Sequence, residues 1–331
     1  MKRFIYVLTA FMSLLAWTSC SKTSDSKKEE GEMMKVKLNL AGDFDVDVSQ
    51  DPLTRAESST DAYAINVTYD NGKYAYGLFD NVGDMTITLL SNHTYTFECT
   101  LIKDARNTLF FGQAFNNTYS GYAYPFQTNS SNSTMITNSF VVGSGTYFTG
   151  FNNGSAHMAS TTSPSTSNAM SYPNTNRFYG KTTNYEPVHN GVINIYLKRA
   201  VFGARFVVSG LQEGSLSLQC GDFFSRTVTA DGTYGRLYTF TNPATVAMND
   251  TPLVATLTAN YSSSRGSLWN LTQTQDIQFK RNVWTTVYVQ LNPDLSAATF
   301  TVTEEEMGED NIINMGINTD GLIDIIVNPE D

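Results

Sequence analysis

The stretch KVKLNLAGDFDVDVS, residues 35–49, alternates between two kinds of side chain. Its even positions carry apolar residues or glycine, and most of its odd positions carry Lys, Asn or Asp. A period of two is typical of a strand that buries one face. The pattern predicts an N-terminal strand, broken or bent at Ala41-Gly42. Its buried face would consist of Val36, Leu38, Leu40, Phe44, Val46 and Val48.

Further strands are predicted along most of the chain. The runs DAYAINVTYD, KYAYGLFD, MTITLL and HTYTFECTLI fall between residues 61 and 102, and Asn71-Gly72 marks a hairpin between the first two. Strands resume after residue 190 with GVINIYLKRAVFGARFVVSG and continue to AATFTVTEE. No sustained helical period occurs. The spacing predicts an all-β protein of two antiparallel β-sandwich domains, residues 35–195 and 196–331.

A stretch without charge separates these two groups of strands. Residues 107–176 contain no Asp, Glu, Lys or Arg and are rich in Asn, Ser, Thr, Gly, Tyr and Phe. We interpret the stretch as a long loop-rich insertion in the first domain. Aromatic side chains among small polar ones are also typical of binding loops, so contact with a neutral glycan or a host protein stays open. The candidate contact residues, in YSGYAYPF, are Tyr119, Tyr122, Tyr124 and Phe126.

The N-terminus has the pattern of an export signal. Two basic residues precede an apolar run over residues 4–17, which is too short to span a bilayer, so residues 1–19 are predicted to be a signal peptide. Small residues before Cys20 resemble a bacterial lipobox and predict lipidation of Cys20, although Trp17 replaces the usual Leu. Ordinary secretion stays the alternative. Residues 20–34 are polar and charged, as expected of a flexible tether.

The net charge and the positions of the histidines argue against several classes of function. The net charge is −10 and no long basic stretch occurs, which argues against binding of nucleic acid. The three histidines, His93, His157 and His189, have neither metal-ligand spacing nor a nucleophile motif near them. No phosphate-binding loop occurs either. The sequence therefore predicts a protein that is not an enzyme and has no cofactor or metal.

Two cysteines remain if Cys20 carries a lipid. Cys99 and Cys220 each continue the apolar face of a predicted strand, so both are predicted to be small core residues. A disulfide between them stays open.

The segment DPLTRAES follows the first strand. It is polar, contains a proline, and places Arg55 before the small residue Ala56, which suits an Arg-specific protease. A cut there would make the first strand removable and would expose a hydrophobic groove that the strand of another chain could fill. An ordinary first strand followed by a solvated arginine is the alternative.

The order of these features resembles the fimbrillin family, the subunits of the protease-mediated (type V) pili of bacteroidete bacteria. The resemblance is carried by the lipobox, the alternating strand, Thr54-Arg55-Ala56, YAINVTYDNGKYAYGLFD and LKRAVFGARFVVSGL. It implies two transthyretin-like sandwiches and a precursor lipidated at Cys20 in the outer membrane. It also implies a cut between Arg55 and Ala56 that discards residues 35–48, followed by polymerisation through strand exchange.

The resemblance places the donor strand at the C-terminus, although an ordinary last core strand is the alternative. The donor residues would be Leu322, Ile323, Ile325, Ile326 and Val327. The expected function is that of a stalk or tip subunit of a surface fimbrium that serves adhesion, with other pilus subunits, and a host protein or glycan, as partners. The alternative function is a surface-anchored lipoprotein that binds glycans.

Overall fold

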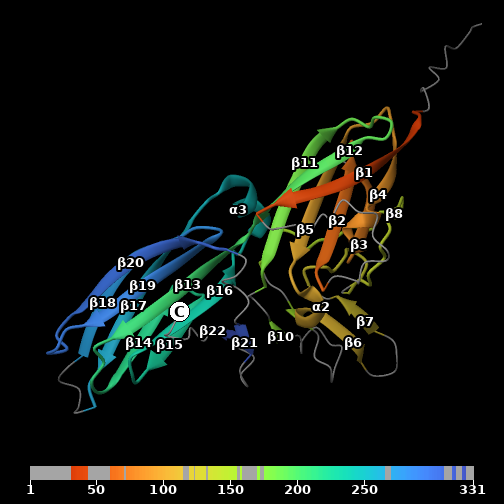
Figure 1. Ribbon diagram of the computed structural model, residues 1–331. Coiled ribbons are helices and arrows are strands. Elements are labelled where there is room, and N and C mark those ends of the chain that lie inside the picture. The colour runs from red at the N-terminus through yellow and green to blue at the C-terminus, as the bar shows by residue number, and fades with distance from the viewer. Residues whose placement is uncertain are drawn as a thin grey trace, which may run out of the picture.

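The computed structural model describes residues 31–43, 60–70, 72–114, 119–122, 124–131, 133–154, 157–158, 170–171, 175–264, 270–308, 315–317 and 323–325. The predicted signal peptide, the lipidation site Cys20 and the processing site at Arg55 and Ala56 lie outside these residues. Figure 1 shows two β-sandwiches that lie end to end, with short helices only. The prediction of an all-β fold is confirmed.

The first sandwich is one sheet of eight strands in the order β4-β1-β12-β11-β5-β2-β3-β8. Its strands are β1 (Met33–Gly42), β2 (Ala62–Tyr69), β3 (Gly72–Phe79), β4 (Thr86–Leu90), β5 (Tyr95–Ile102), β8 (Val141–Val142), β11 (Arg177–Tyr185) and β12 (Val192–Arg199). Strands β11 and β12 share only two residue pairs, and the sheet turns there, so that β4-β1-β12 form one layer and the other five strands the second. The apolar faces of both layers enclose one core.

The predicted hairpin between β2 and β3 is confirmed. Tyr69 pairs with Gly72, so the turn begins at Asp70, one position earlier than the Asn-Gly signal indicates. Asp70 adopts a positive φ of 43°, a conformation that Asp and Asn tolerate better than most residues.

The charge-free insertion contains short elements on the end of the first sandwich. They are β6 (Phe110–Ala114), β7 (Tyr119–Tyr122), β9 (His157–Met158) and β10 (Met170–Ser171), preceded by η1 (Val82–Asp84) and α2 (Ala105–Thr108). A second apolar cluster lies beneath the insertion and includes Leu78, Tyr122 and Phe126. The expectation of a loop-rich insertion agrees with these short strands.

The second sandwich consists of two four-stranded sheets, β16-β13-β19-β20 and β15-β14-β17-β18. Its elements are β13 (Val201–Ser209), β14 (Ser215–Cys220), β15 (Phe224–Val228), β16 (Gly232–Thr239), α3 (Pro243–Asn249), β17 (Leu253–Ser262), β18 (Asn270–Phe279), β19 (Val283–Leu291) and β20 (Ala298–Glu306). A core rich in aromatic rings, among them Phe202, Phe206 and Phe279, fills the space between the sheets. A C-terminal hairpin of β21 (Met315–Ile317) and β22 (Ile323–Ile325) follows, and β22 lies near β16.

The junction between the domains is Ala200. Strand β12 continues in the first sheet to Arg199, and β13 begins in the second at Val201, so the change of domain falls five residues beyond the expected last residue, 195. Only Ala200 separates the two strands in the sequence, and no proline or glycine marks a turn between them. Only the change of pairing partners, from β1 and β11 to β16 and β19, marks the boundary.

Cys99 and Cys220 are both fully buried and lie in different sandwiches. Their interpretation as small core residues is confirmed. Both thiols are free, which answers the question of a disulfide.

Candidate functional site

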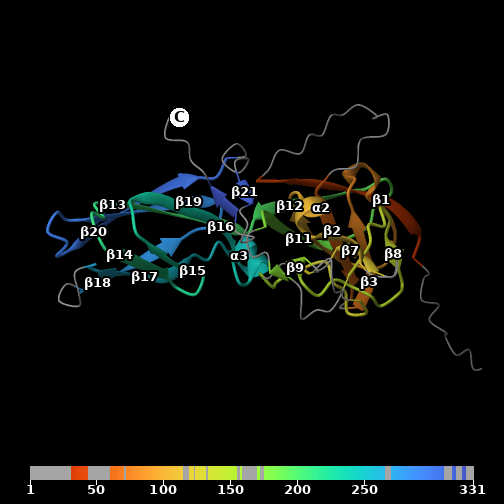
Figure 2. The same ribbon diagram turned by 90° about the horizontal axis from the view of Figure 1, so that it is seen from below.

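Strand β1 fills a slot between two strands that come from distant parts of the chain. Its first half, Met33–Lys37, pairs antiparallel with β4, and its second half, Lys37–Gly42, pairs parallel with β12. The strand is thus paired on both flanks, but each partner covers only about half of its length (Figures 1 and 2). Withdrawal of β1 would leave β4 and β12 with unpaired inner edges.

The inward face of β1 is apolar, as the alternation predicts. Val36, Leu38 and Leu40 are at most 4% exposed and belong to the core of the first sandwich. Burial of three such side chains stabilises the strand by roughly 5–9 kcal/mol gross, before the cost of ordering the chain. Phe44, Val46 and Val48 lie outside the described residues.

A single segment of the chain connects β1 covalently to the rest of its domain. No folded segment among the described residues precedes β1, and the chain from its end to β2 runs through residues 44–59, which contain Arg55. The two walls of the slot, β4 and β12, are each continuous with the rest of the domain. A cut in residues 44–59 would therefore leave β1 attached by non-covalent contacts alone.

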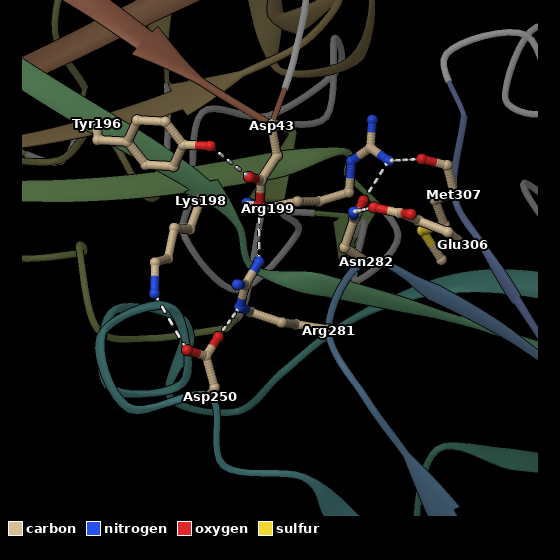
Figure 3. Close-up of polar contacts among 9 residues, drawn as sticks. All are labelled: Asp43, Tyr196, Lys198, Arg199, Asp250, Arg281, Asn282, Glu306 and Met307. Carbon is tan, nitrogen blue, oxygen red and sulfur yellow. Dashed lines mark hydrogen bonds and ion pairs between the residues drawn. The ribbon is translucent and has the colours of Figure 1, made fainter.

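The residue directly after β1 binds to groups of both domains (Figure 3). The Asp43 carboxylate accepts hydrogen bonds from Arg281 Nη1 at 2.7 Å, from the backbone N–H of Arg199 at 3.1 Å and from the Tyr196 hydroxyl at 3.2 Å. The Asp43 N–H in turn donates to the Leu197 carbonyl at 3.0 Å. We call the Asp43 carboxylate and its three donors the Asp43 clasp. It fixes the C-terminal end of β1.

A second carboxylate holds the arginine of the clasp in place. Asp250, directly after α3, accepts a hydrogen bond from Arg281 Nε and another from Lys198 Nζ at 3.1 Å. The bond from Arg281, with help from Lys198, holds the pKa of Asp250 below its ordinary value. The charge of Asp43 raises the pKa of Tyr196. Arg281 is thus positioned by its own domain, independently of β1.

Arg199 joins the two sandwiches beside the clasp. Its buried guanidinium donates through Nη1 to Asn282 Oδ1 at 2.7 Å and to the Met307 carbonyl at 3.0 Å. The same group lies over the Phe178 ring, 5.1 Å from its centroid. The last strand of the first domain is therefore bound to the ends of β19 and β20 in the second.

The expected ligand contacts on the insertion are corrected by the structure. Tyr122 is 4% exposed and Phe126 is fully buried, and their rings meet edge to face with centroids 5.9 Å apart. Both belong to the core beneath the insertion, so neither can form a binding surface. Tyr124 is half-buried, and the side chain of Tyr119 lies outside the described residues. These two aromatic residues pack into the apolar cluster that lies between the insertion and the first sandwich.

The predicted donor strand is described only in part. Ile323 and Ile325 bound β22, which pairs with β21 in a short antiparallel hairpin. Leu322, Ile326 and Val327 lie outside the described residues. The donor role of this segment stays a prediction.

Two kinds of site are absent from the described part of the chain. There, no three side chains of His, Cys, Asp or Glu gather as a metal ion would require. Within the same residues, no helix combines the length and the apolar character needed to cross a membrane.

Comparisons with known proteins give similarity at the level of solved structures. No protein-family model and no curated protein matches the chain. The chain is similar to the tip fimbrial protein Mfa3 of Porphyromonas gingivalis, with 9% identity, a TM-score of 0.36, and coverage of 83% of this chain and 100% of that chain. The fimbrial anchor protein Mfa2 of the same organism gives 10% identity, a TM-score of 0.35, and coverage of 83% and 98%.

A structure from Bacteroides thetaiotaomicron, described as a candidate polysaccharide-binding protein, gives 11% identity, a TM-score of 0.34, and coverage of 84% and 99%. The structural neighbours thus include fimbrial proteins, and none of these three is described as an enzyme. At these identities and TM-scores the likeness assigns no function to this chain.

Proposed function

We propose that this chain is a fimbrial subunit of the cell surface, exported as a lipoprotein through Cys20 and assembled by strand exchange. One observation carries the proposal: β1 is a well-paired strand of the first sandwich, yet residues 44–59 alone connect it to that sandwich. A single cut between Arg55 and Ala56 would turn an internal strand into a bound peptide.

The vacated slot would be a strong binding site for another strand. Its floor is the apolar core that Val36, Leu38 and Leu40 now cover, and its walls are the inner edges of β4 and β12. Unpaired backbone groups and apolar surface both favour an incoming strand, which restores the ladder and the core together. Because β1 is paired on both flanks, β4 would lose its only ladder partner among the described strands until such a strand arrives.

The incoming strand is proposed to be the C-terminal segment of a neighbouring subunit. Residues 322–327 are apolar except for Asp324, and in a strand Ile323, Ile325 and Val327 would share one face, as Val36, Leu38 and Leu40 do in β1. In this proposal the partners of the chain are other pilus subunits. The lipid anchors the precursor to the outer membrane, and the assembled fimbrium functions in adhesion. No catalytic activity and no cofactor are assigned.

The alternative, a glycan-binding lipoprotein, loses support from the structure. Its candidate contacts Tyr122 and Phe126 are core residues. The pilus function is therefore favoured over the alternative.

The experiment is limited digestion of the purified chain with an Arg-specific protease. We expect a new N-terminus at Ala56, followed by oligomer ladders that survive mild SDS. Arg55→Lys keeps the charge but removes the cleavage site, so this variant should stay intact and monomeric. Arg106→Lys, at an exposed position in α2, is the matched control and should behave as the parent chain. A chain that is trimmed to Ala56 and stays monomeric would contradict the proposal.

A further inference from the structure

We propose that the slot of β1 selects its occupant by charge as well as by shape. The strand that enters must carry a carboxylate three residues beyond its last buried side chain, where the Asp43 clasp receives it. The inference rests on the proposed function, since it requires that a second strand takes the place of β1.

The clasp has the composition of a carboxylate receptor. A guanidinium, a hydroxyl and a backbone N–H converge on the two oxygens of Asp43. The side chains of Asp43 and Arg281 are only 17% and 19% exposed, so water screens their attraction less than at an open surface. Charge-assisted hydrogen bonds of this kind are among the stronger polar contacts in proteins.

The receptor stays assembled when its ligand leaves. None of the three donors belongs to β1: two come from β12, and Arg281 comes from the turn before β19. Asp250 binds Arg281 from the side away from Asp43 and is itself bound by Lys198 (Figure 3). A preorganised cation costs an incoming strand little to bind, and a strand without an acid would leave it uncompensated.

The position of the acid is fixed by the register of β1. Leu40 is the last buried residue of the strand, and Asp43 follows it by three positions. Between them, Gly42 passes so close to β12 that a Cβ would lie 1.9 Å from the Leu197 carbonyl oxygen. The Asp43 N–H donates to the same carbonyl, so the close approach of the two backbones holds Asp43 beside its donors.

The C-terminus of a second copy of the chain carries the same spacing. Ile323, Ile325 and Val327 repeat the spacing of Val36, Leu38 and Leu40, and Glu330 follows Val327 by three positions as Asp43 follows Leu40. Pro329 falls at the place of Gly42, so this strand would have to leave the sheet there, and the longer Glu side chain supplies the added reach. We therefore commit to Glu330 of a second copy as the carboxylate that replaces Asp43.

The test uses the full chain after cleavage at Arg55 and fluorescently labelled peptides that exchange into the slot. One peptide covers residues 33–43 and another residues 320–331. We expect Asp43→Asn in the first and Glu330→Gln in the second to weaken binding about tenfold or more. Lys37→Gln in the first peptide alters an outward-facing charge instead and should leave binding within about twofold.

A variant of the receptor assigns the effect to the clasp. In Arg281→Gln protein, acid and amide peptides should bind equally within about twofold. If circular dichroism shows that this variant is unfolded, the comparison is made on the parent chain in 1 M NaCl, where screening should shrink the preference for the acid.

Each outcome has one meaning. Equal binding of the acid and amide peptides to the parent chain overturns the selection by charge but leaves strand exchange standing. Binding of the 33–43 peptide without binding of the 320–331 peptide overturns the assignment of Glu330. Failure of both peptides to enter the slot overturns the proposed function, and this inference with it.

Discussion

Arg177 Nη2 lies 2.9 Å from the carbonyl oxygen of Gly150 and binds a turn within the charge-free insertion. Arg177 is the first charged residue after that insertion and is fully buried. Its guanidinium also donates to the carbonyls of Phe151 and Asn153. Burial lowers the pKa of Arg177 to about 9. A buried cation held by carbonyl dipoles thus attaches a neutral insertion to the sheet.

Arg177→Met should destabilise the chain by about 3 kcal/mol, because it leaves three carbonyls without the donor that satisfies them. The free energy of unfolding in urea measures the loss, and hydrogen exchange should quicken in residues 150–154. Arg106→Met, at an exposed position, is the control and should cost less than about 0.5 kcal/mol. A loss for Arg177→Met as small as that of the control would refute the structural role.

Tyr122→Ala should lower stability by about 3–4 kcal/mol, because it removes a buried ring from the core beneath the insertion. Met135→Ala is the comparison, since Met135 is half exposed, and it should change stability little. Thermal unfolding of both variants decides the point. Loss of glycan retention by Tyr122→Ala with unchanged stability would revive the alternative of a binding surface.

Gly42→Ala should weaken the binding of β1 in its slot, because the added Cβ would collide with the Leu197 carbonyl at the end of the strand. The expected cost is about 1–3 kcal/mol. The observable is faster cleavage at Arg55 by a limiting amount of protease, since a loosened strand end exposes the following segment. Ala41→Gly, one residue earlier, lies on the exposed face and makes no such collision. Equal cleavage rates for the two variants would contradict the close approach.

The two buried thiols should make stability fall at alkaline pH. Burial raises the pKa of Cys220 from 9.0 to about 12, and it also raises the pKa of Cys99. A thiol with a higher pKa in the folded state stabilises fully below pH 9 and loses that contribution as the pH rises toward 12. The urea midpoint should drop as the pH rises from 9 toward 12.

Cys220→Ala should reduce that drop, even if its stability at pH 8 is lower. Both thiols should also resist a thiol reagent until urea unfolds the chain. An undiminished drop in the variant would mean that other groups, such as buried tyrosines, carry the effect.

Much of the fold follows from the alternation of side chains. A strand that buries one face has apolar residues at every second position of its sequence. This period predicted the inward residues of β1, the hairpin of β2 and β3, and the burial of Cys99 and Cys220. The boundary at Ala200 could not be placed precisely, because no turn signal separates β12 from β13 and the two strands differ only in their partners.

The aromatic residues of the insertion show that composition alone does not distinguish a binding surface from a core. Tyr122 and Phe126 stand among small polar residues, a pattern shared by binding loops and by the thin core of an inserted segment. Burial alone separates the two cases, and it depends on Leu78 and other residues that lie far away in the sequence.

The sequence by itself determined most of the strands and their buried faces, because these depend on neighbours along the chain. Only the tertiary structure decided that β1 lies between β4 and β12 and that Asp43 meets Arg281, 238 residues further on. No local pattern encodes such a contact, since an aspartate after a strand and an arginine before another look the same whether they face water or each other. Their meeting depends on the packing of two domains, which brings the ends of distant strands to one place.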